Sequence, residues 1–313
     1  MKKILLDCDP GHDDMMAMML ALSRPELKVL GITTVAGNQT GEKTLRNALR
    51  VLTLIGRKDI RVARGFDKPI LRDLVIAPNI HGVSGLDGAA LPEPQVEPIK
   101  MHAVDFIIET LEKETEKVYL VPTGPLTNIA VTLIKAPEIK EKIKGIVLMG
   151  GAAFDSNITP ASEFNIFVDP EAAKIVFKSG IPITMVGLDV TNKAVLSFED
   201  IDALEQMQGK VSKVVAPLLR FFANANKEIF GINGAPLHDA LAVAYLIDES
   251  VLKTKCLHVD IETKGEFTRG ETVVDVYGIT KKELNADVAL DLNLPRFKEL
   301  IFKSIKELNK SVK

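Results

Sequence analysis

The stretch that decides the fold is LLDCDPGHDD (residues 5–14), in which a short apolar run ends in a cluster of acids. Asp7, Asp9, Asp13 and Asp14 fall within eight positions. Two carboxylates about 4 Å apart repel by about 1 kcal/mol in water, and by about 4 kcal/mol at an effective dielectric near 20. Such a cluster must be splayed into solvent, partly protonated or neutralised by a cation.

Strand-like apolar runs alternate with helix-like stretches through most of the chain. Near-continuous apolar strands separated by helices are typical of a mostly parallel sheet with helices on both faces. We therefore expect an α/β fold, a single domain over residues 1–313 with an open, Rossmann-like sheet. The runs that predict its strands are KILLDCD (3–9), KVLGITTVAG (28–37), KVYLVPTG (117–124), IKGIVLMGG (143–151) and PITMVGLDV (182–190).

Two further regions stand apart from this alternation. The segment 66–98 is rich in Pro and Gly and lacks periodicity, so we expect a long surface loop near the strand ends. After residue 257, three strand-like runs predict a small extra sheet or hairpin before a C-terminal helix at about 295–309. Helices are also expected at about 13–22, 40–55, 102–114, 126–135 and 210–230, and from about 238.

Composition excludes several classes of protein. The net charge of -3 and pI near 6.0 argue against a nucleic-acid or anionic-membrane partner. Cys8 and Cys256 form neither a disulfide framework nor a CxxC motif, which favours a reducing, cytoplasmic setting. The run MMAMMLAL (15–22) is far shorter than the roughly 20 residues that cross a bilayer. We expect a soluble protein.

Polar residues follow the end of each predicted strand. Because the carboxyl ends of parallel strands meet at one edge of a sheet, these residues are expected to converge on a ligand site. The polar segments are the acids of residues 7–14, GNQT with Asn38, PTGPLTN with Thr123, MGG followed by Asn157 and SEFNIFVDP, and LHDALA with His238 and Asp239.

The acids at residues 7–14 have two interpretations. Helix capping, with Asp9 near the N-cap and Asp13 and Asp14 favouring the helix dipole, explains one or two of them. It does not explain Asp7 and Asp9 alternating along a strand that should be buried. Carboxylate oxygens suit Ca²⁺ or Mg²⁺, and no His/Cys spacing suggests zinc.

The remaining candidates are weaker when each is taken alone. His238 and Asp239 begin an apolar helix, where Asp239 is either a cap or a metal ligand and His238 is a possible proton donor. Glu163 and Asn165 are expected on one face of an extended segment. His81 is a lone loop histidine, most often only solvated, and Met149 more often packs in a core than contacts a substrate.

The motifs DCDPGHDD, GNQT, VPTGPLTNIA, VLMGGA, SEFNIFVDPEAA and HDA resemble, in order and spacing, the inosine–uridine-preferring nucleoside hydrolases. The resemblance runs from residue 3 to about 250. It implies the nucleoside hydrolase fold and cleavage of the N-glycosidic bond of ribonucleosides, pyrimidine, purine or both, to free base and ribose. It also implies a tightly bound Ca²⁺, a homotetramer and a role in nucleoside salvage.

The resemblance also implies roles for single residues. Asp9, Asp14, Asp239 and the backbone carbonyl of Thr123 match the calcium ligands, with Asp9 also the general base on the calcium-bound water. His81 and His238 match positions linked to the base and its departure, and Asp7 is expected to orient its neighbours. The positions that match substrate contacts are Asp13, Asn38, Met149, Asn157, Glu163, Phe164 and Asn165.

One departure and two alternatives remain open. Some pyrimidine-preferring relatives carry Tyr where this chain has Phe230, which cannot relay a proton. A phosphohydrolase of the DxD type is one alternative, although Gly11 stands where that pattern wants Thr or Val. A non-catalytic nucleoside- or ribose-binding protein is the other, and the intact set of Asp9, Asp14 and Asp239 argues against it. The sequence leaves open the preferred base and whether deoxyribose is accepted.

Overall fold

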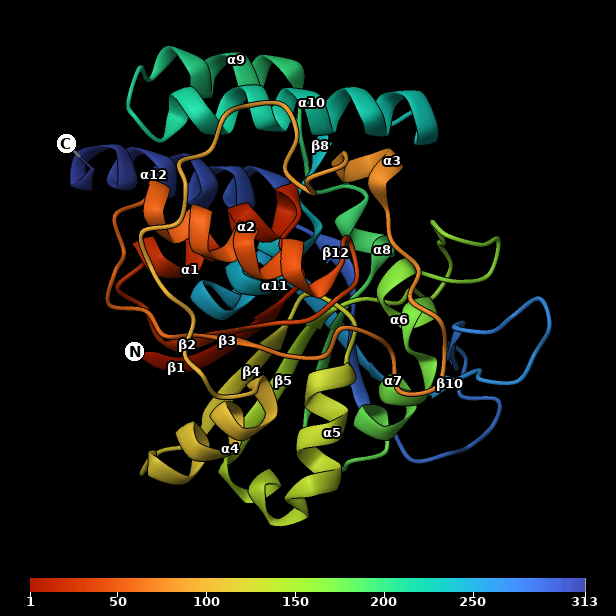
Figure 1. Cartoon of the computed structure of the whole chain (residues 1–313). Helices are drawn as coiled ribbons and strands as arrows, with labels where there is room; N and C mark the ends of the chain where they lie inside the picture. The colour runs from red at the N-terminus through yellow and green to blue at the C-terminus, as the bar shows by residue number, and fades with distance from the viewer. Residues whose placement is uncertain (313) are drawn as a thin grey trace.

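A mostly parallel sheet forms the centre of the computed structural model, which describes residues 1–312 (Figure 1). The strands at its centre are buried along most of their length, as expected of a sheet covered on both faces, whereas the strand at one edge is largely exposed. The last strand alone runs antiparallel to its neighbour. In order across the sheet they are β3 (Val62–Arg64), β2 (Leu27–Thr34), β1 (Lys2–Cys8), β4 (Val118–Pro122), β5 (Ile143–Met149), β6 (Ile183–Val186), β12 (Ala286–Leu292) and β9 (Leu252–Leu257).

Helices pack on both faces of this sheet and enclose two apolar cores. The α/β prediction is therefore confirmed. The first core lies under α1 (His12–Ser23), α2 (Gly41–Leu54), α11 (His238–Ile247) and α12 (Leu294–Ser311). The second lies under α4 (Ala103–Lys113), α5 (Thr127–Lys135) and α7 (Pro170–Phe177).

The remaining elements lie outside the main sheet. Two longer helices, α9 (Phe198–Gln206) and α10 (Ser212–Phe230), lie side by side at the top of Figure 1. The short helices are α3 (Pro78–His81), α6 (Phe164–Val168) and α8 (Leu188–Thr191), with 3₁₀ turns η1 (Pro137–Lys142) and η2 (Glu249–Val251). Two small sheets pair β7 (Val195–Leu196) with β8 (Ala235–Pro236), and β10 (Val259–Ile261) with β11 (Thr272–Val274).

The C-terminal expectation was wrong in one respect. The β10–β11 hairpin does form a separate small sheet, but β12 pairs in parallel with β6 and extends the main sheet. Its residues Val288 and Ala289 are fully buried, so the strand is part of the core. A strand is drawn into a sheet by such burial, which the alternating sequence ADVALDL did not reveal.

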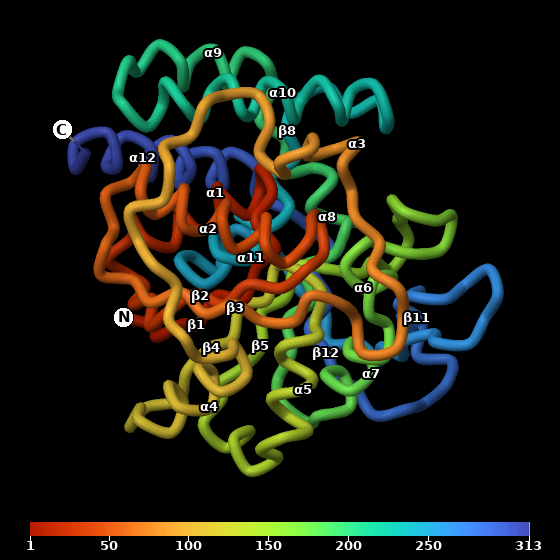
Figure 2. The backbone as a smooth tube through the Cα atoms, viewed as in Figure 1, coloured from red at the N-terminus to blue at the C-terminus, as the bar shows by residue number. Residues whose placement is uncertain are grey.

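The long segment after β3 runs over the surface, as predicted. In Figure 2 it passes α7 and α6, rises to α3 beside α10, and returns over α2 to α4. Its backbone is mostly irregular, and α3 is its one helix among the described residues. Within residues 1–312, no helix combines the length and apolar content that a bilayer crossing requires.

Candidate functional site

The acidic stretch turns from β1 into α1 beneath a pocket. Gly11 is the N-cap of α1, and its N–H donates to the Oδ2 of Asp14 at 3.1 Å. The N-cap is therefore not Asp9. A Cβ at Gly11 would lie 2.5 Å from Nδ1 of His81, so glycine is required for the long loop to approach. Capping explains the position of Asp14, but it does not explain why Asp9 and Asp13 are buried as well.

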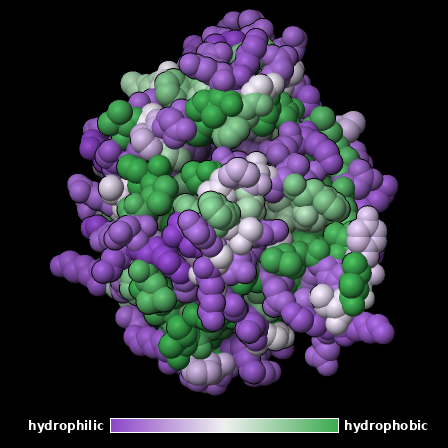
Figure 3. All heavy atoms as spheres, turned by 90° about the vertical axis from the view of Figure 1, so that its right-hand side faces the viewer, coloured by the Kyte–Doolittle hydropathy of each residue, from purple (hydrophilic) through white to green (hydrophobic). Residues whose placement is uncertain are grey.

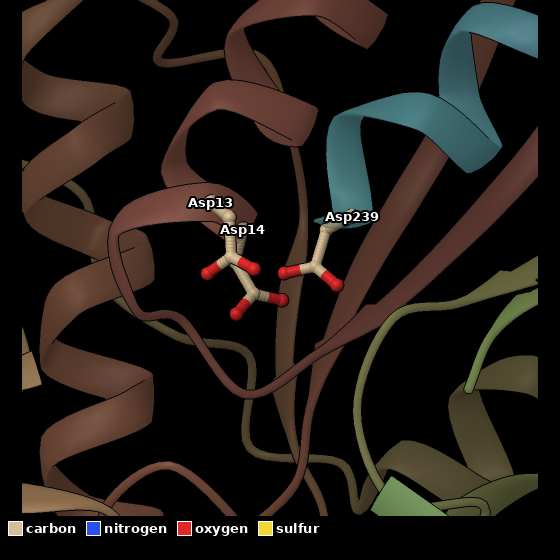
Figure 4. Close-up of side chains that lie close together, drawn as sticks. All are labelled: Asp13, Asp14 and Asp239. Carbon is tan, nitrogen blue, oxygen red and sulfur yellow. The ribbon is translucent and has the colours of Figure 1, made fainter. Parts of the chain in front are cut away.

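Asp13, Asp14 and Asp239 bring carboxylate oxygens within 4.8 Å of one another (Figure 4). The first two come from α1 and the third from the first turn of α11, which packs against α1. Burial, with the charge of Asp14, raises the pKa of Asp13 to about 8. Burial and the neighbouring acids raise the pKa of Asp239 well above its usual range. Without a cation this cluster therefore holds protons near neutral pH.

Asp9 lies beside this cluster and is fully buried. Its Oδ2 accepts the backbone N–H of Asn38 at 2.6 Å, while Oδ1 has no partner among residues 1–312. Oδ1 of Asp13 is also buried without a partner. Because a buried carboxylate oxygen without a partner is costly, these atoms fit a positive ligand. An all-oxygen donor set is the kind that Ca²⁺ and Mg²⁺ take.

Thr123 and Asp7, two residues with predicted roles at the site, lie near this cluster. Thr123, after β4, donates from Oγ1 to Oδ1 of Asp14 at 2.8 Å, and its carbonyl accepts from Nδ2 of Asn165 at 2.8 Å. Asp7 does not line the pocket: its Oδ1 accepts from Thr33 and Asn128 at 2.6 and 2.8 Å, and its Oδ2 is buried without a partner among residues 1–312. Burial raises the pKa of Asp7 to about 7. Its expected orienting role remains a prediction.

An open pocket of about 110 Å³ lies above the acids. Figure 3 shows one face of the molecule, on which apolar and polar patches alternate and no single apolar area dominates. Asp9 and Asp14 lie below the pocket. The sequence-predicted residues that line it are Asp13, Asn38, His81, Thr123, Met149, Asn157, Glu163, Phe164, Asn165, His238 and Asp239.

The segment with Glu163 and Asn165 is helical, which corrects the extended conformation expected from sequence. Glu163 is the N-cap of α6 and accepts from the backbone N–H groups of Asn165, Ile166 and Gly151. Glu163 and Asn165 still line the same pocket, because the N-cap and the first turn both lie at the N-terminal end of α6. Burial raises the pKa of Glu163 to about 7, against the effect of these three hydrogen bonds.

The amide groups of the pocket are oriented by the backbone. Nδ2 of Asn165 donates to the carbonyls of Thr123 and Met149, which leaves its Oδ1 for a ligand. Oδ1 of Asn157 accepts the N–H of Phe164 at 2.9 Å, which leaves its Nδ2. Met149 and Phe164 are themselves buried, so they serve both the core and the pocket wall.

Two histidines also line the pocket. His81 ends α3 and stacks on Phe222, with ring centroids 5.3 Å apart. Burial, with the charges of His12 and His238, lowers the pKa of His81 well below its usual range. Nδ1 of His238 lies 2.8 Å from Oγ1 of Thr191, and burial lowers the pKa of His238 to about 4.

Sequence reasoning missed part of the pocket wall. The sequence patterns assign His12 no role, yet its ring lies against His81, with the two Nδ1 atoms 3.2 Å apart. The missed lining residues were Ile76, Ala77, Asn79, Ile80, Ile158, Phe222 and Asn226. The helical spacing of Phe222, Asn226 and Phe230 on α10 was the available signal, since Phe230 had already been singled out.

Comparison with known proteins decides the family. Residues 4–299 match the model of the family described as inosine-uridine preferring nucleoside hydrolase. The chain belongs to this family. It is 52% identical to the pyrimidine-specific ribonucleoside hydrolase RihA of Photobacterium profundum, over 96% of this chain and 97% of that protein. It is also 52% identical to the RihA of Escherichia fergusonii, over 97% of this chain and 98% of that one.

Solved structures agree. The purine-preferring ribonucleoside hydrolase from Gardnerella vaginalis matches with a TM-score of 0.93 and 36% identity, covering 99% of both chains. A plant nucleoside hydrolase matches with a TM-score of 0.92 and 30% identity, covering 97% of this chain and 99% of that one. The expected family is confirmed, and the chain is a nucleoside hydrolase rather than a DxD phosphohydrolase or a non-catalytic binding protein.

Proposed function

We propose that this enzyme hydrolyses pyrimidine ribonucleosides with a Ca²⁺ held by Asp9, Asp14, Asp239 and the carbonyl of Thr123. The observation that carries the proposal is the group of buried carboxylates, with unpartnered oxygens, at the floor of the pocket. Ca²⁺ accepts carboxylate and backbone carbonyl oxygens in a flexible geometry, which this mixed set offers. When bound, the ion would make water easier to deprotonate and would hold ribose hydroxyls in register.

The ribose is proposed to lie over the acids. Asp13 and Asp239 line the pocket whereas Asp9 and Asp14 do not. Because Asp239 is assigned to the Ca²⁺, Asp13 is the acid of this cluster left for a hydroxyl group. Oδ1 of Asn165 and Nδ2 of Asn157 are free for further hydroxyls, since each amide's other end is bound to backbone. Asn38 and Glu163 line the same wall. A sugar with several hydroxyls would satisfy these groups together.

Bond cleavage is proposed to begin with Asp9. Its Oδ1 takes a proton from water, whose oxygen bonds to C1′ of the ribose while the bond from C1′ to the base nitrogen breaks. The base leaves with the bonding electron pair and takes its proton from solvent, and Asp9 then returns its own proton to solvent. The transition state carries positive charge on the ribose, which the surrounding carboxylates stabilise. Asp9 is held for this step by the N–H of Asn38 at 2.6 Å.

His238 is proposed to assist the departing base, with His81 beside it. Because the pKa of His238 is lowered to about 4, its ring is uncharged at neutral pH and offers a hydrogen bond rather than a full positive charge. A hydrogen bond to the base stabilises the negative charge that develops as the base leaves. Phe230 lines the pocket but has no group that could do this.

The preference for pyrimidines is proposed from the relatives. Those at 52% identity are named pyrimidine-specific, whereas the purine-preferring structure is 36% identical. The homotetramer, the cytoplasmic location, the salvage role and the single-domain boundary of 1–313 remain predictions from the sequence.

Release of free ribose from uridine, cytidine, inosine, adenosine and guanosine tests the proposal. We expect release of ribose, with kcat/KM highest for uridine and cytidine. Equal or better turnover of the purine nucleosides would overturn the preference, and no ribose from any of them would overturn the proposed function.

A further inference from the structure

The hydroxyl of Thr191, which lies outside the pocket, is hydrogen-bonded to the pocket residue His238. Thr191 ends α8, directly after β6, and is fully buried. Its Oγ1 lies 2.8 Å from Nδ1 of His238, and this is its one side-chain hydrogen bond among residues 1–312. Because a buried hydroxyl without a partner is costly, the pair is held together. Thr191 does not line the pocket.

This contact determines which ring nitrogen meets a substrate. His238 lines the pocket, and no hydrogen bond from the described residues reaches its Nε2. A ring flip would bring Nδ1 into the pocket and would break the bond to Thr191. The hydroxyl therefore holds the ring with Nε2 facing the ligand.

The contact can form with either tautomer of His238, but the Thr191 hydroxyl has no other hydrogen-bond acceptor among residues 1–312, so its O–H is satisfied when it donates to Nδ1. A hydroxyl that donates to Nδ1 leaves the single proton of a neutral imidazole on Nε2. His81 meets a different donor, since its Nδ1 lies 3.3 Å from the backbone N of His12. A backbone amide is not altered by substitution, whereas the Thr191 hydroxyl can be removed almost without change of volume.

We propose that Thr191 is a positioning residue for leaving-group departure, holding His238 with its Nε2–H directed at the base. The inference rests on the proposed function, because it requires that His238 assist the base. Thr191 touches no substrate, so its effect must pass through His238.

The kinetic test uses Thr191→Val, which removes the hydroxyl, and Thr191→Ser, which retains it. With uridine, whose base is a poor leaving group, we expect Thr191→Val to lower kcat by about tenfold. With p-nitrophenyl riboside, whose leaving group needs no assistance, it should change kcat by less than about twofold, because the chemistry at the ribose is intact. Thr191→Ser should retain wild-type rates on both. In a His238→Ala background, Thr191→Val should cause no further loss on uridine.

Equal losses on the two substrates, or no loss on uridine, would overturn the proposal. A spectroscopic measurement keeps its outcome separate from that of the proposed function. The chain has five histidines, so long-range ¹⁵N–¹H spectra of ¹⁵N-histidine-labelled protein resolve their tautomers. Wild type and Thr191→Ser should show His238 protonated on Nε2, and Thr191→Val a mixture. An unchanged His238 spectrum in Thr191→Val would contradict the positioning role, whatever the activity. Failure of the wild type to release ribose would instead count against the proposed function.

Discussion

Asn165 donates from Nδ2 to the backbone carbonyl of Thr123 at 2.8 Å, and so joins the ribose wall of the pocket to its acidic floor. The same Nδ2 lies 3.2 Å from the carbonyl of Met149. One buried amide thus fixes the ends of β4 and β5 relative to each other.

Asn165→Asp places a carboxylate oxygen against these two carbonyls. We expect a loss of about 1–3 kcal/mol in the free energy of unfolding, because acceptors then face acceptors in a buried site. Urea titration measures it. Asn157→Asp is the matched control, since Oδ1 of Asn157 already accepts the N–H of Phe164 and an acid retains that contact. Similar losses in both variants would count against the assigned orientation of Asn165.

Asp9→Asn removes the proposed base while an oxygen remains for the N–H of Asn38. We expect kcat on uridine to fall by about 10²- to 10⁴-fold. The chelated variant should be no less stable than the chelated wild type, because burial and Asp14 already disfavour the charged form of Asp9. Steady-state kinetics and thermal melting measure the two effects. Turnover near that of the wild type would refute the role of Asp9.

His238→Ala should separate substrates by leaving group. We expect kcat to fall by about 100-fold with uridine, and by less than about tenfold with p-nitrophenyl riboside, whose leaving group departs without assistance. His258→Ala is the control, because His258 bonds to Asp260 and Glu283 away from the pocket and its loss should leave both rates unchanged. Equal losses on both substrates in His238→Ala would remove the leaving-group role.

The stability of the chelated protein should fall as pH rises. Burial raises the pKa of Asp13 to about 8 and that of Glu163 to about 7, both above the values of an unfolded chain. The folded state therefore retains protons from about pH 4 to pH 8 that the unfolded chain has released, so the free energy of unfolding decreases across this range. A bound cation replaces those protons, and Ca²⁺ should raise Tm more at pH 8 than at pH 5.

Calorimetric melting with chelator and with Ca²⁺, at pH 5 and pH 8, checks this. Asp13→Asn should make the pH dependence of the chelated protein shallower, since one raised group is lost. A chelated wild type that becomes more stable towards pH 8 would contradict the expectation.

The convergence of the site could be predicted because it follows from topology. Asp9, Asn38, Thr123 and Met149 come at or just after the ends of β1, β2, β4 and β5, and parallel strands end at one edge. No contact had to be known for this. The family resemblance then supplied their separate roles.

Other features depend on tertiary contacts that a single sequence does not show. The period of α10 predicts an apolar face but not that Phe222 and Asn226 face a pocket rather than the core. The helical turn at Glu163 depends on its three backbone donors, one of which is Gly151, twelve residues earlier. His12 acquires its neighbour His81 only because the long loop returns across Gly11.

The measurement that tests the central claim most directly is ribose release from uridine by the protein as purified, after exhaustive chelation, and after addition of Ca²⁺ or Mg²⁺. The account predicts that chelation abolishes release and that Ca²⁺ restores it more fully than Mg²⁺, which requires a stricter octahedral geometry. Undiminished release after chelation, with the metal shown to be absent by elemental analysis, would contradict it.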